Sequence, residues 1–270
     1  MYAFDYERPG SVADAKAALG REEATLLGGG QTLIPTLKQR LAAPSVLVSL
    51  AGIEEMKGVR AEGEGLWIGG ATTHEVCAAE LDGRHVGLSY LASRIGDPAV
   101  RARGTIGGSL ANDDPSACWP AGILGANGTI HTDRRSIPAD EFFVGMFETA
   151  LEEGEIVTAV TVPTCKHSAY AKMIQPASRF PLTAAFVCKT EGRVAITGAS
   201  EGGVFRWAEA EAALASDFSE GAVEALEPPT GDMISDLHGT ADYRRHLCKV
   251  MTKRAVRCVT EGSAGMSSAG

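Results

Sequence analysis

The stretch Leu27-Gly28-Gly29-Gly30-Gln31-Thr32-Leu33 joins a short apolar segment, residues 24–27, to residues 32–41, whose apolar positions have helical spacing. Three consecutive glycines allow a sharp turn, because glycine has no Cβ and adopts positive φ. The amides freed by such a turn, together with the start of a helix, attract an anion. A glycine run alone is equally consistent with a tight strand-to-helix turn that binds nothing.

A second glycine-rich stretch, Arg103-Gly104-Thr105-Ile106-Gly107-Gly108-Ser109-Leu110-Ala111-Asn112, follows about 75 residues later. It has the same character, with hydroxyls at Thr105 and Ser109. Two such loops can hold the two phosphates of one pyrophosphate. Leu33 stands where the dinucleotide fingerprint GxGxxG has its last glycine, and no GxxxxGK[ST] motif follows either loop. The pair therefore predicts a dinucleotide held in a different fold.

Patterns on both sides of the loops predict three units. Residues 1–55 contain a helix over 11–19 with Ser11 as its N-cap, and strands over 24–27 and 46–50. In residues 56–165 we expect strands over 66–68 and 156–162, helices over 73–79 and 88–93, and a strand and turn over 123–132. A boundary near 163–168 opens a third unit, 166–262, with strands over 169–173, 183–189 and 194–197 and helices over 207–215, 219–226 and 241–260. The small, polar tail 263–270 is expected to be disordered.

Composition excludes several classes of protein. The chain has 270 residues, 44% hydrophobic and 22% charged, as in an ordinary globular protein. Its net charge of −9 argues against nucleic acid, which requires a basic face. No apolar stretch is long enough for a membrane span, and the start has no signal-peptide pattern, which predicts the cytoplasm. Six cysteines without metal spacing predict buried free thiols in a reducing compartment.

With both loops in view, the chain resembles a known family. Residues 28–33 resemble the first FAD loop, usually Ala-Gly-Gly-Gln-Ser-Leu, of the medium subunit of carbon-monoxide-dehydrogenase-like molybdenum hydroxylases, which belong to the xanthine-dehydrogenase family. Thr105-Ile106-Gly107-Gly108-Ser109 is similar to the second FAD loop. The likeness continues through 4–9, 111–115, 142–143, 150–155, 176–180 and 242–247, and so covers nearly the whole chain in order.

The resemblance implies an α+β fold. Two α/β subdomains of the PCMH type sandwich FAD, and a C-terminal domain with a small antiparallel sheet and helices completes the chain. The FAD-binding residues that it implies are Gly28, Gly29, Gly30, Gln31, Thr32, Leu33, Thr105, Ile106, Gly107, Gly108, Ser109, Asn112, Asp114 and Lys172.

Individual positions within that set carry further expectations. Asp114 is expected to accept from a ribose or ribityl hydroxyl. Lys172 stands near the place of a lysine that relatives hold beside the flavin, although Gln175 aligns as well. Two positions depart from the family: Gly28 replaces the usual alanine, and Asp113 replaces an uncharged residue. Two adjacent carboxylates near a pyrophosphate would repel it, so Asp113 is expected to face solvent.

The resemblance also implies a function. A large molybdopterin-binding subunit would oxidise the substrate, and a small subunit with two [2Fe–2S] clusters would carry the electrons, in a dimer of heterotrimers. This chain would pass electrons through FAD to NAD, a quinone or oxygen. Neither loop contains histidine, so the flavin is expected to be non-covalent. The rivals are a self-contained FAD oxidoreductase of related fold and a non-catalytic assembly or binding protein.

Other conspicuous residues favour structural roles. The six scattered histidines form no catalytic or metal-binding grouping, and Trp67, Trp119 and Trp207 are expected in the core or an interface. Residues 95–97 are expected near the isoalloxazine ring, where a partner subunit could dock. The last helix carries a basic face that is either solvated or a docking surface; its members are Arg244, Arg245, Lys249, Lys253, Arg254 and Arg257.

Overall fold

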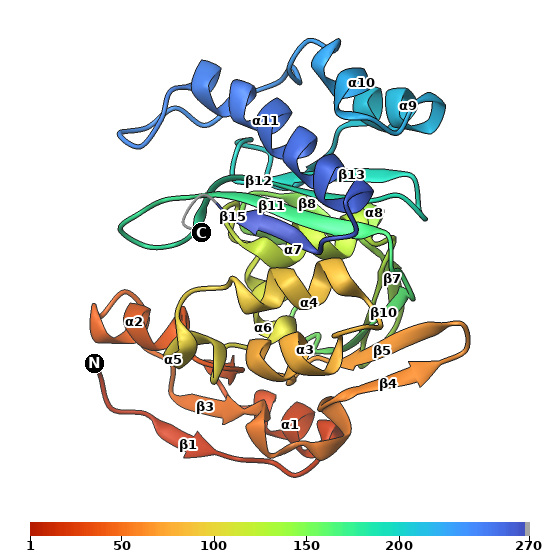
Figure 1. The fold of residues 1–270 in the computed structure, drawn as a ribbon. Helices are drawn as coiled ribbons and strands as arrows, with labels where there is room; N and C mark the ends of the chain where they lie inside the picture. The colour runs from red at the N-terminus through yellow and green to blue at the C-terminus, as the bar shows by residue number, and fades with distance from the viewer. Residues whose placement is uncertain (268–270) are drawn as a thin grey trace.

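The computed structural model describes residues 1–267 and builds the chain as stacked layers (Figure 1). The N-terminal layer is a parallel sheet in the order β1-β3-β2, with α1 and α2 in its connections. Its elements are β1 Asp5–Glu7, α1 Val12–Leu19, β2 Ala24–Leu27, α2 Leu33–Lys38 and β3 Val46–Ser49, followed by the 3-10 turns η1 Leu50–Gly52 and η2 Glu54–Met56. Ser11 caps α1 as predicted, since its hydroxyl accepts from the N–H of Asp14.

The middle layer is a five-stranded antiparallel sheet, in the order β4-β5-β10-β6-β7, with helices packed on it. Its strands are β4 Val59–Glu62, β5 Gly65–Gly69, β6 Thr129–Thr132, β7 Ser136–Pro138 and β10 Val157–Pro163, and a separate hairpin pairs β8 Phe143–Gly145 with β9 Glu148–Thr149. Its helices are α3 His74–Glu80, α4 Val86–Ser93, α5 Pro98–Arg101, α6 Ile106–Asn112, α7 Cys118–Gly125 and α8 Ala139–Phe142.

The C-terminal layer is a sheet in the order β14-β13-β12-β11-β15, covered on its outer face by the last helices (Figure 1). Its strands are β11 Ser168–Ile174, β12 Pro181–Cys188, β13 Arg193–Thr197, β14 Phe205–Arg206 and β15 Gly265–Ser267, and its helices are α9 Ala208–Ser216, α10 Glu220–Glu224 and α11 Ala241–Thr260. The predicted strands and helices of this unit are all present, with ends that shift by a few residues.

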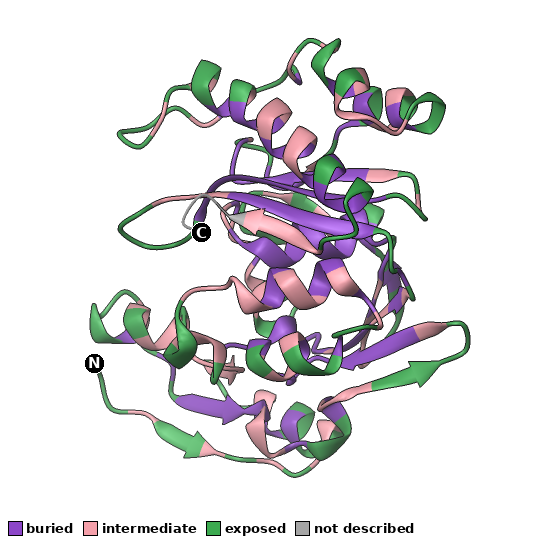
Figure 2. Cartoon of the chain, viewed as in Figure 1, coloured by how far each residue is buried: buried purple, intermediate pink, exposed green. Residues whose placement is uncertain are grey.

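The core does not follow the predicted unit boundaries. One hydrophobic cluster combines residues of the middle sheet and its helices, such as Ile68 and Trp119, with Phe186 and Ala195 from β12 and β13. The opposite face of the C-terminal sheet packs on α9 to α11 in a second cluster, and the N-terminal sheet has a third. Strand β12 is therefore buried along its whole length (Figure 2). The sheets group residues 5–49, 59–163 and 168–267, but the middle and C-terminal units share one core.

Two expectations about local structure were wrong. Residues 118–125 form helix α7, where the pattern over 123–132 predicted strand and turn, and only β6 matches. All eight residues of α7 are buried, so it lacks the polar face that marks a surface helix in a sequence. The tail was predicted to be disordered, but residues 265–267 form β15, which pairs in parallel with β11. The last three residues of that tail lie outside the described part.

The tryptophans are core residues as expected. Trp119 and Trp207 are almost fully buried, and Trp67 is 8% exposed with the Arg60 guanidinium over its ring. Within residues 1–267, no helix has both the length and the apolar character that a bilayer span requires.

Candidate functional site

The first glycine loop, residues 27–33, leaves a row of backbone amides without partners. It leads from the end of β2 into α2, and Gly30 takes a φ of +72°, which favours glycine. The Gln31 side chain holds the turn by donating to the carbonyl of Gly29 at 3.1 Å. Within residues 1–267, the backbone N–H groups of residues 29–33 donate no hydrogen bond. Five adjacent free donors at the start of a helix form a site for an anion.

The second glycine loop, residues 103–109, uses most of its amides internally. Thr105 caps α6 by accepting from the N–H of Gly108 at 3.2 Å. Ile106 donates to the carbonyl of Thr72 at 3.1 Å and Gly107 to that of Gly70 at 2.9 Å. The two loops are therefore not equivalent, because only the first has a row of free amides. Backbone hydrogen bonds hold the second loop against the end of β5, at residues 69–72. The donors that this loop can offer a ligand are therefore side chains, such as that of Ser109.

The two loops touch, although they are far apart in the sequence. A Cβ added at Gly29 would lie 2.0 Å from the carbonyl oxygen of Arg103 and 2.5 Å from the Cα of Gly104. A Cβ added at Gly28 would lie 2.9 Å from the hydroxyl of Thr105 and at an ordinary contact distance of 3.7 Å from the Cα of Gly108. Gly29 is thus required by backbone packing between the N-terminal and middle layers. The structure brings together the two loops that the sequence singled out.

A cavity of about 340 Å³ borders both loops. Its wall includes Gly28, Thr105 and three cationic side chains, Arg8, Lys57 and Arg103. The positive charge favours anionic groups near the loops. Sequence reasoning assigned no role to Arg8 and Lys57, because they come from separate connections and share no motif, and it quoted Arg103 only as the start of the second loop.

The end of α6 contains the largest departure from expectation. Asp113 was expected to face solvent, but it is 1% exposed and adopts a left-handed conformation with φ 39°. Its Oδ2 has no hydrogen-bond partner in the described chain. Burial, together with the charge of Asp114, raises the pKa of Asp113 to about 7. The Oδ1 of Asp114 accepts from the N–H of Ser116, and Asn112 is half-buried on the last turn of the helix.

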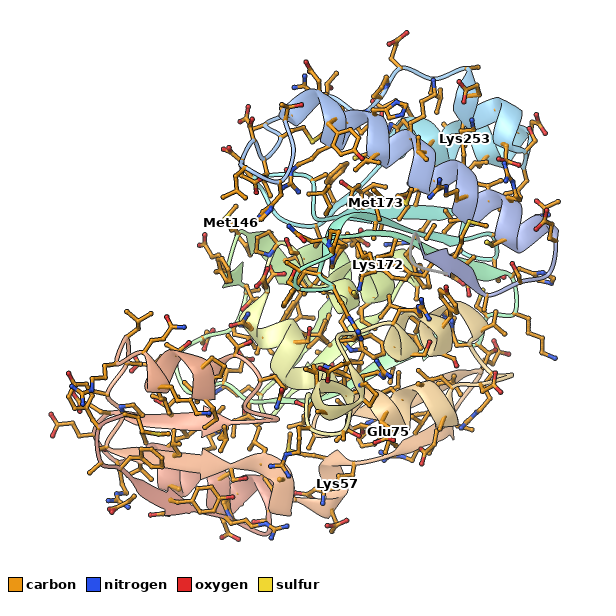
Figure 3. The ribbon with its side chains drawn as sticks, turned by 60° about the vertical axis from the view of Figure 1, so that its left-hand side comes forward. Lys57, Glu75, Met146, Lys172, Met173 and Lys253 are labelled. Atoms are coloured by element: carbon orange, nitrogen blue, oxygen red, sulfur yellow. The ribbon has the colours of Figure 1, made fainter. Side chains whose placement is uncertain are left out.

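Lys172 lies deep in the molecule, on β11 (Figure 3). Only 1% of the residue is exposed, and its Nζ donates to the carbonyl of Arg94 at 3.0 Å and lies 3.6 Å from the Sγ of Cys118. Among the described residues, no carboxylate lies within ion-pair distance of this ammonium. Gln175 points elsewhere, since its side-chain amide contacts His238 and the N–H of Ala177.

The turn at residues 94–96 is held in place by cations. The ammonium of Lys172 donates to the carbonyl of Arg94. The guanidinium of Arg101 donates to the carbonyls of Ile95 and Gly96, at 3.0 and 3.3 Å. Asp97 is exposed and caps α5. The segment expected near the isoalloxazine ring is thus a rigid turn that also reaches the surface.

His74 has a structural place behind the second loop. Its Nδ1 accepts from the indole N–H of Trp119 at 3.0 Å, and burial lowers its pKa to about 4. Its Nε2 would lie 2.6 Å from a Cβ at Gly104, so the ring packs directly on the loop. In residues 1–267, no group of three or more His, Cys, Asp or Glu side chains could hold a metal ion.

Comparison with known proteins agrees with this geometry. Residues 2–165 match the family described as the FAD binding domain in molybdopterin dehydrogenase. The chain is 33% identical to the carbon monoxide dehydrogenase medium chain of Hydrogenophaga pseudoflava, with 94% of this chain and 96% of that one aligned. It is 32% identical to the nicotine 6-hydroxylase medium subunit of Paenarthrobacter nicotinovorans, with the same coverage.

A solved structure extends the likeness to the whole fold. The structure of reconstituted CO dehydrogenase from Oligotropha carboxidovorans matches with a TM-score of 0.89 and 31% identity, over 97% of this chain and 99% of that one. The fold and the two contacting glycine loops define a flavoprotein of the PCMH type. The chain belongs to the family of FAD-binding domains of molybdopterin dehydrogenases, and its cofactor is FAD.

Proposed function

We propose that this chain is the flavin subunit of a multi-subunit molybdenum hydroxylase. It receives electrons from iron–sulfur clusters on a partner subunit and passes them through FAD to an external acceptor. The observation that carries the proposal is the row of five free amides at residues 29–33, placed where the two glycine loops meet. The relatives that support the proposal align with this chain over nearly the full length of both proteins.

The amides of the first loop are the proposed pyrophosphate donors. Gly28, Gly29, Gly30, Gln31, Thr32 and Leu33 form this part of the site. The second loop adds hydroxyl groups and a close backbone surface through Thr105, Ile106, Gly107, Gly108 and Ser109. Asn112 and Asp114 at the end of α6 extend the site towards the sugar hydroxyls. Free amides and nearby cations match the charge of a pyrophosphate, so these residues fit the cofactor.

The raised pKa of the buried Asp113 lessens its repulsion of a nearby pyrophosphate. Its raised pKa of about 7 keeps the carboxyl largely protonated in mildly acidic solution. A neutral carboxyl does not repel phosphate, and its unpartnered oxygen can take part in a hydrogen bond to a bound hydroxyl.

Lys172, rather than Gln175, is the proposed flavin-side residue. Its ammonium has three donors, and the protein partners named above occupy two of them. A buried cation without a carboxylate partner is costly unless another acceptor is present. The turn at residues 94–96, which Lys172 holds, is proposed to lie beside the ring.

The cofactor supplies the two-electron redox chemistry, while the residues of this chain bind and orient it. No acid–base catalyst is assigned. The flavin is proposed to be non-covalent. Partners are a large molybdopterin-binding subunit and a small [2Fe–2S] subunit, assembled as a dimer of heterotrimers in the cytoplasm. The six buried thiols are consistent with a reducing compartment.

Co-expression with its genomic neighbours tests the proposal. The tagged chain alone should purify with FAD, without molybdenum or iron, and no organic substrate should bleach its flavin. The co-expressed complex should contain molybdenum and about four iron atoms per FAD, as two [2Fe–2S] clusters require. Substrate-dependent bleaching in the isolated chain would establish the self-contained oxidoreductase instead. A chain that never retains FAD would favour the assembly protein.

A further inference from the structure

Two cysteine side chains meet where the middle and C-terminal sheets join. Cys165 follows the end of β10, and Cys188 is the last residue of β12. Their Sγ atoms lie 3.0 Å apart, and both thiols are free. The two residues are 2% and 0% exposed. Among the described residues, no other two cysteine sulfurs come within hydrogen-bond distance of each other.

Polar groups surround this thiol pair. The Oγ1 of Thr190 lies 3.3 Å from the Sγ of Cys165. Ser168 pairs with Cys188 across β11 and β12, and its hydroxyl lies 3.4 Å from the Nδ1 of His85. Burial lowers the pKa of His85 to about 4, and its Nε2 has no partner in the described chain. His85 is therefore a neutral imidazole, and its Nδ1 faces the Ser168 hydroxyl beside the pair.

The surroundings favour a thiolate at one of the two sulfurs. The hydrogen bond shared with Cys188 lowers the pKa of the Cys165 thiol; burial opposes this shift, and the contacts with Thr190 and Ser168 add to it. The same shared proton raises the pKa of Cys188. A thiolate with a second thiol in contact is the arrangement in which oxidation gives a disulfide.

A surface cavity gives small oxidants a route to the pair. Its volume is about 550 Å³, and it is lined by the neighbours of Cys165 on both sides, Thr164, Lys166 and His167, and by Thr190. The cations Lys166 and Arg84 face the same cavity. Thr190 lines this cavity and its Oγ1 lies 3.3 Å from the Cys165 sulfur, so the pair lies just behind the cavity wall.

We propose that Cys165 and Cys188 form a reversible dithiol site that hydrogen peroxide oxidises to a disulfide. The Cys165 thiolate attacks one peroxide oxygen, the O–O bond breaks, and sulfenic acid and hydroxide form. The Cys188 thiol then attacks the sulfenic sulfur, and water leaves with the thiol proton. Two sulfurs lose two electrons in total, and one peroxide becomes two waters. The new bond ties the end of β10 to the end of β12, across the predicted domain boundary.

Thiol counting and peptide mapping of the FAD-loaded full chain test this site. After hydrogen peroxide treatment and denaturation, the count of titratable thiols should fall from six to four. Trypsin should then release residues 136–166 and 180–189 as one linked peptide, since each segment contains a single cysteine. Dithiothreitol should separate the two peptides and restore all six thiols.

Serine variants identify the sulfurs. Cys165→Ser and Cys188→Ser should each abolish the linked peptide, whereas the matched buried control Cys258→Ser should retain it. FAD content, measured in every variant, reports whether each one has folded. The proposal is overturned if peroxide links other cysteines, if Cys165 proceeds to sulfinic acid without a link, or if all six thiols survive in folded protein.

Discussion

At the scale of single residues, the contrast between Gly28 and Gly29 gives a sharp test of the FAD site. An added methyl at Gly29 must push apart the backbones of both loops, whereas one at Gly28 displaces only a hydroxyl. We expect Gly29→Ala to lower FAD affinity by at least about tenfold, equivalent to about 1.4 kcal/mol. Gly28→Ala, which restores the usual family residue, should stay close to wild type. Dissociation constants from FAD titration of the deflavinated proteins provide the comparison.

Thermal unfolding of the same variants separates binding from folding. Gly29→Ala should remain folded, because the clash involves loop backbone at residues 29 and 103–104, which belongs to none of the three hydrophobic clusters. Equal FAD affinity in both variants would mean that the first loop is only a turn.

Asp113 should make stability depend on pH. Its pKa is about 7 in the folded chain against an ordinary 3.8, so the folded state binds more protons between these values. The free energy of unfolding should therefore fall as pH rises from about 4 to about 7. Asp113→Asn has no carboxyl to ionise, so its free energy of unfolding should not fall in this way. Its stability gain over wild type should therefore grow with pH, to on the order of 1 kcal/mol after allowance for solvent screening. Urea unfolding at about pH 5 and about pH 8 measures the difference.

A matched control separates buried charge from net charge. Asp82 is exposed, so Asp82→Asn removes one negative charge without changing a buried group. If Asp113→Asn gains no more at high pH than at low pH, the carboxyl is already hydrated in solution.

The sequence predicted the glycine loops at this scale, because their signal is local. It could not predict the burial of Asp113, which depends on the hairpin at β8 and β9: the N–H of Phe147 donates to the carbonyl of Asp113. The partners of Lys172 were equally hidden, since they come from residues 94 and 118, about 55–80 positions away.

At the scale of elements, the basic face of α11 has two different parts. Arg244 is buried, and its guanidinium donates to the carbonyls of Leu182 and Gly198 and to both oxygens of Asp236. The outer cations pair instead with α10, as in Arg257 with Glu220 and Lys253 with Glu224. The sequence left open whether this basic face is solvated or docks a partner. Much of it instead attaches α11 to its own chain.

The two kinds of arginine should differ in their contribution to stability. Arg244→Met strands two carbonyls and a carboxylate, so the free energy of unfolding should fall by about 3 kcal/mol. Arg257→Met removes a surface pair and should cost less than about 1 kcal/mol. Urea denaturation of both proteins at one pH gives the comparison. Equal losses would mean that Arg244 contributes no more than a surface ion pair.

The spacing of apolar residues predicted the helices and strands that have one exposed face, and it failed to predict elements without one. Helix α11 was placed over its full length, because it alternates buried and exposed residues. Helix α7 has no exposed residue and therefore no amphipathic pattern, while Gly122 and Gly125 allow Leu88, Leu91 and Phe186 to pack closely on it. Strand β15 forms only because β11 has a free edge for it, which no local rule reveals.

At the scale of the whole molecule, α5 offers a test of where the partner docks. Ala99 is exposed beside the turn at residues 94–96, which we place near the flavin. Ala99→Arg should leave FAD binding unchanged and weaken recovery of the metal-containing partners by about tenfold or more, because a charge buried at an interface is costly. Ala212→Arg, on the exposed side of α9, is the matched control and should assemble normally. Pull-down from the co-expressing strain measures both.

If the Ala99→Arg variant assembles fully, the partner does not dock at α5. Loss of assembly in both variants would indicate that an added arginine is itself harmful.

The shared core also decides when this chain can fold during its synthesis. The middle sheet starts at residue 59, yet its hydrophobic cluster includes Phe186, Ala195 and Val204 from the C-terminal sheet. A ribosome must therefore deliver about 200 residues before that cluster can close, although the FAD loops emerge within the first 110. Until then, the nascent chain exposes apolar surface from α4 and α7, a state in which chaperones usually bind. Contacts this distant in sequence also slow folding, because the loop-closure entropy must be overcome before they form.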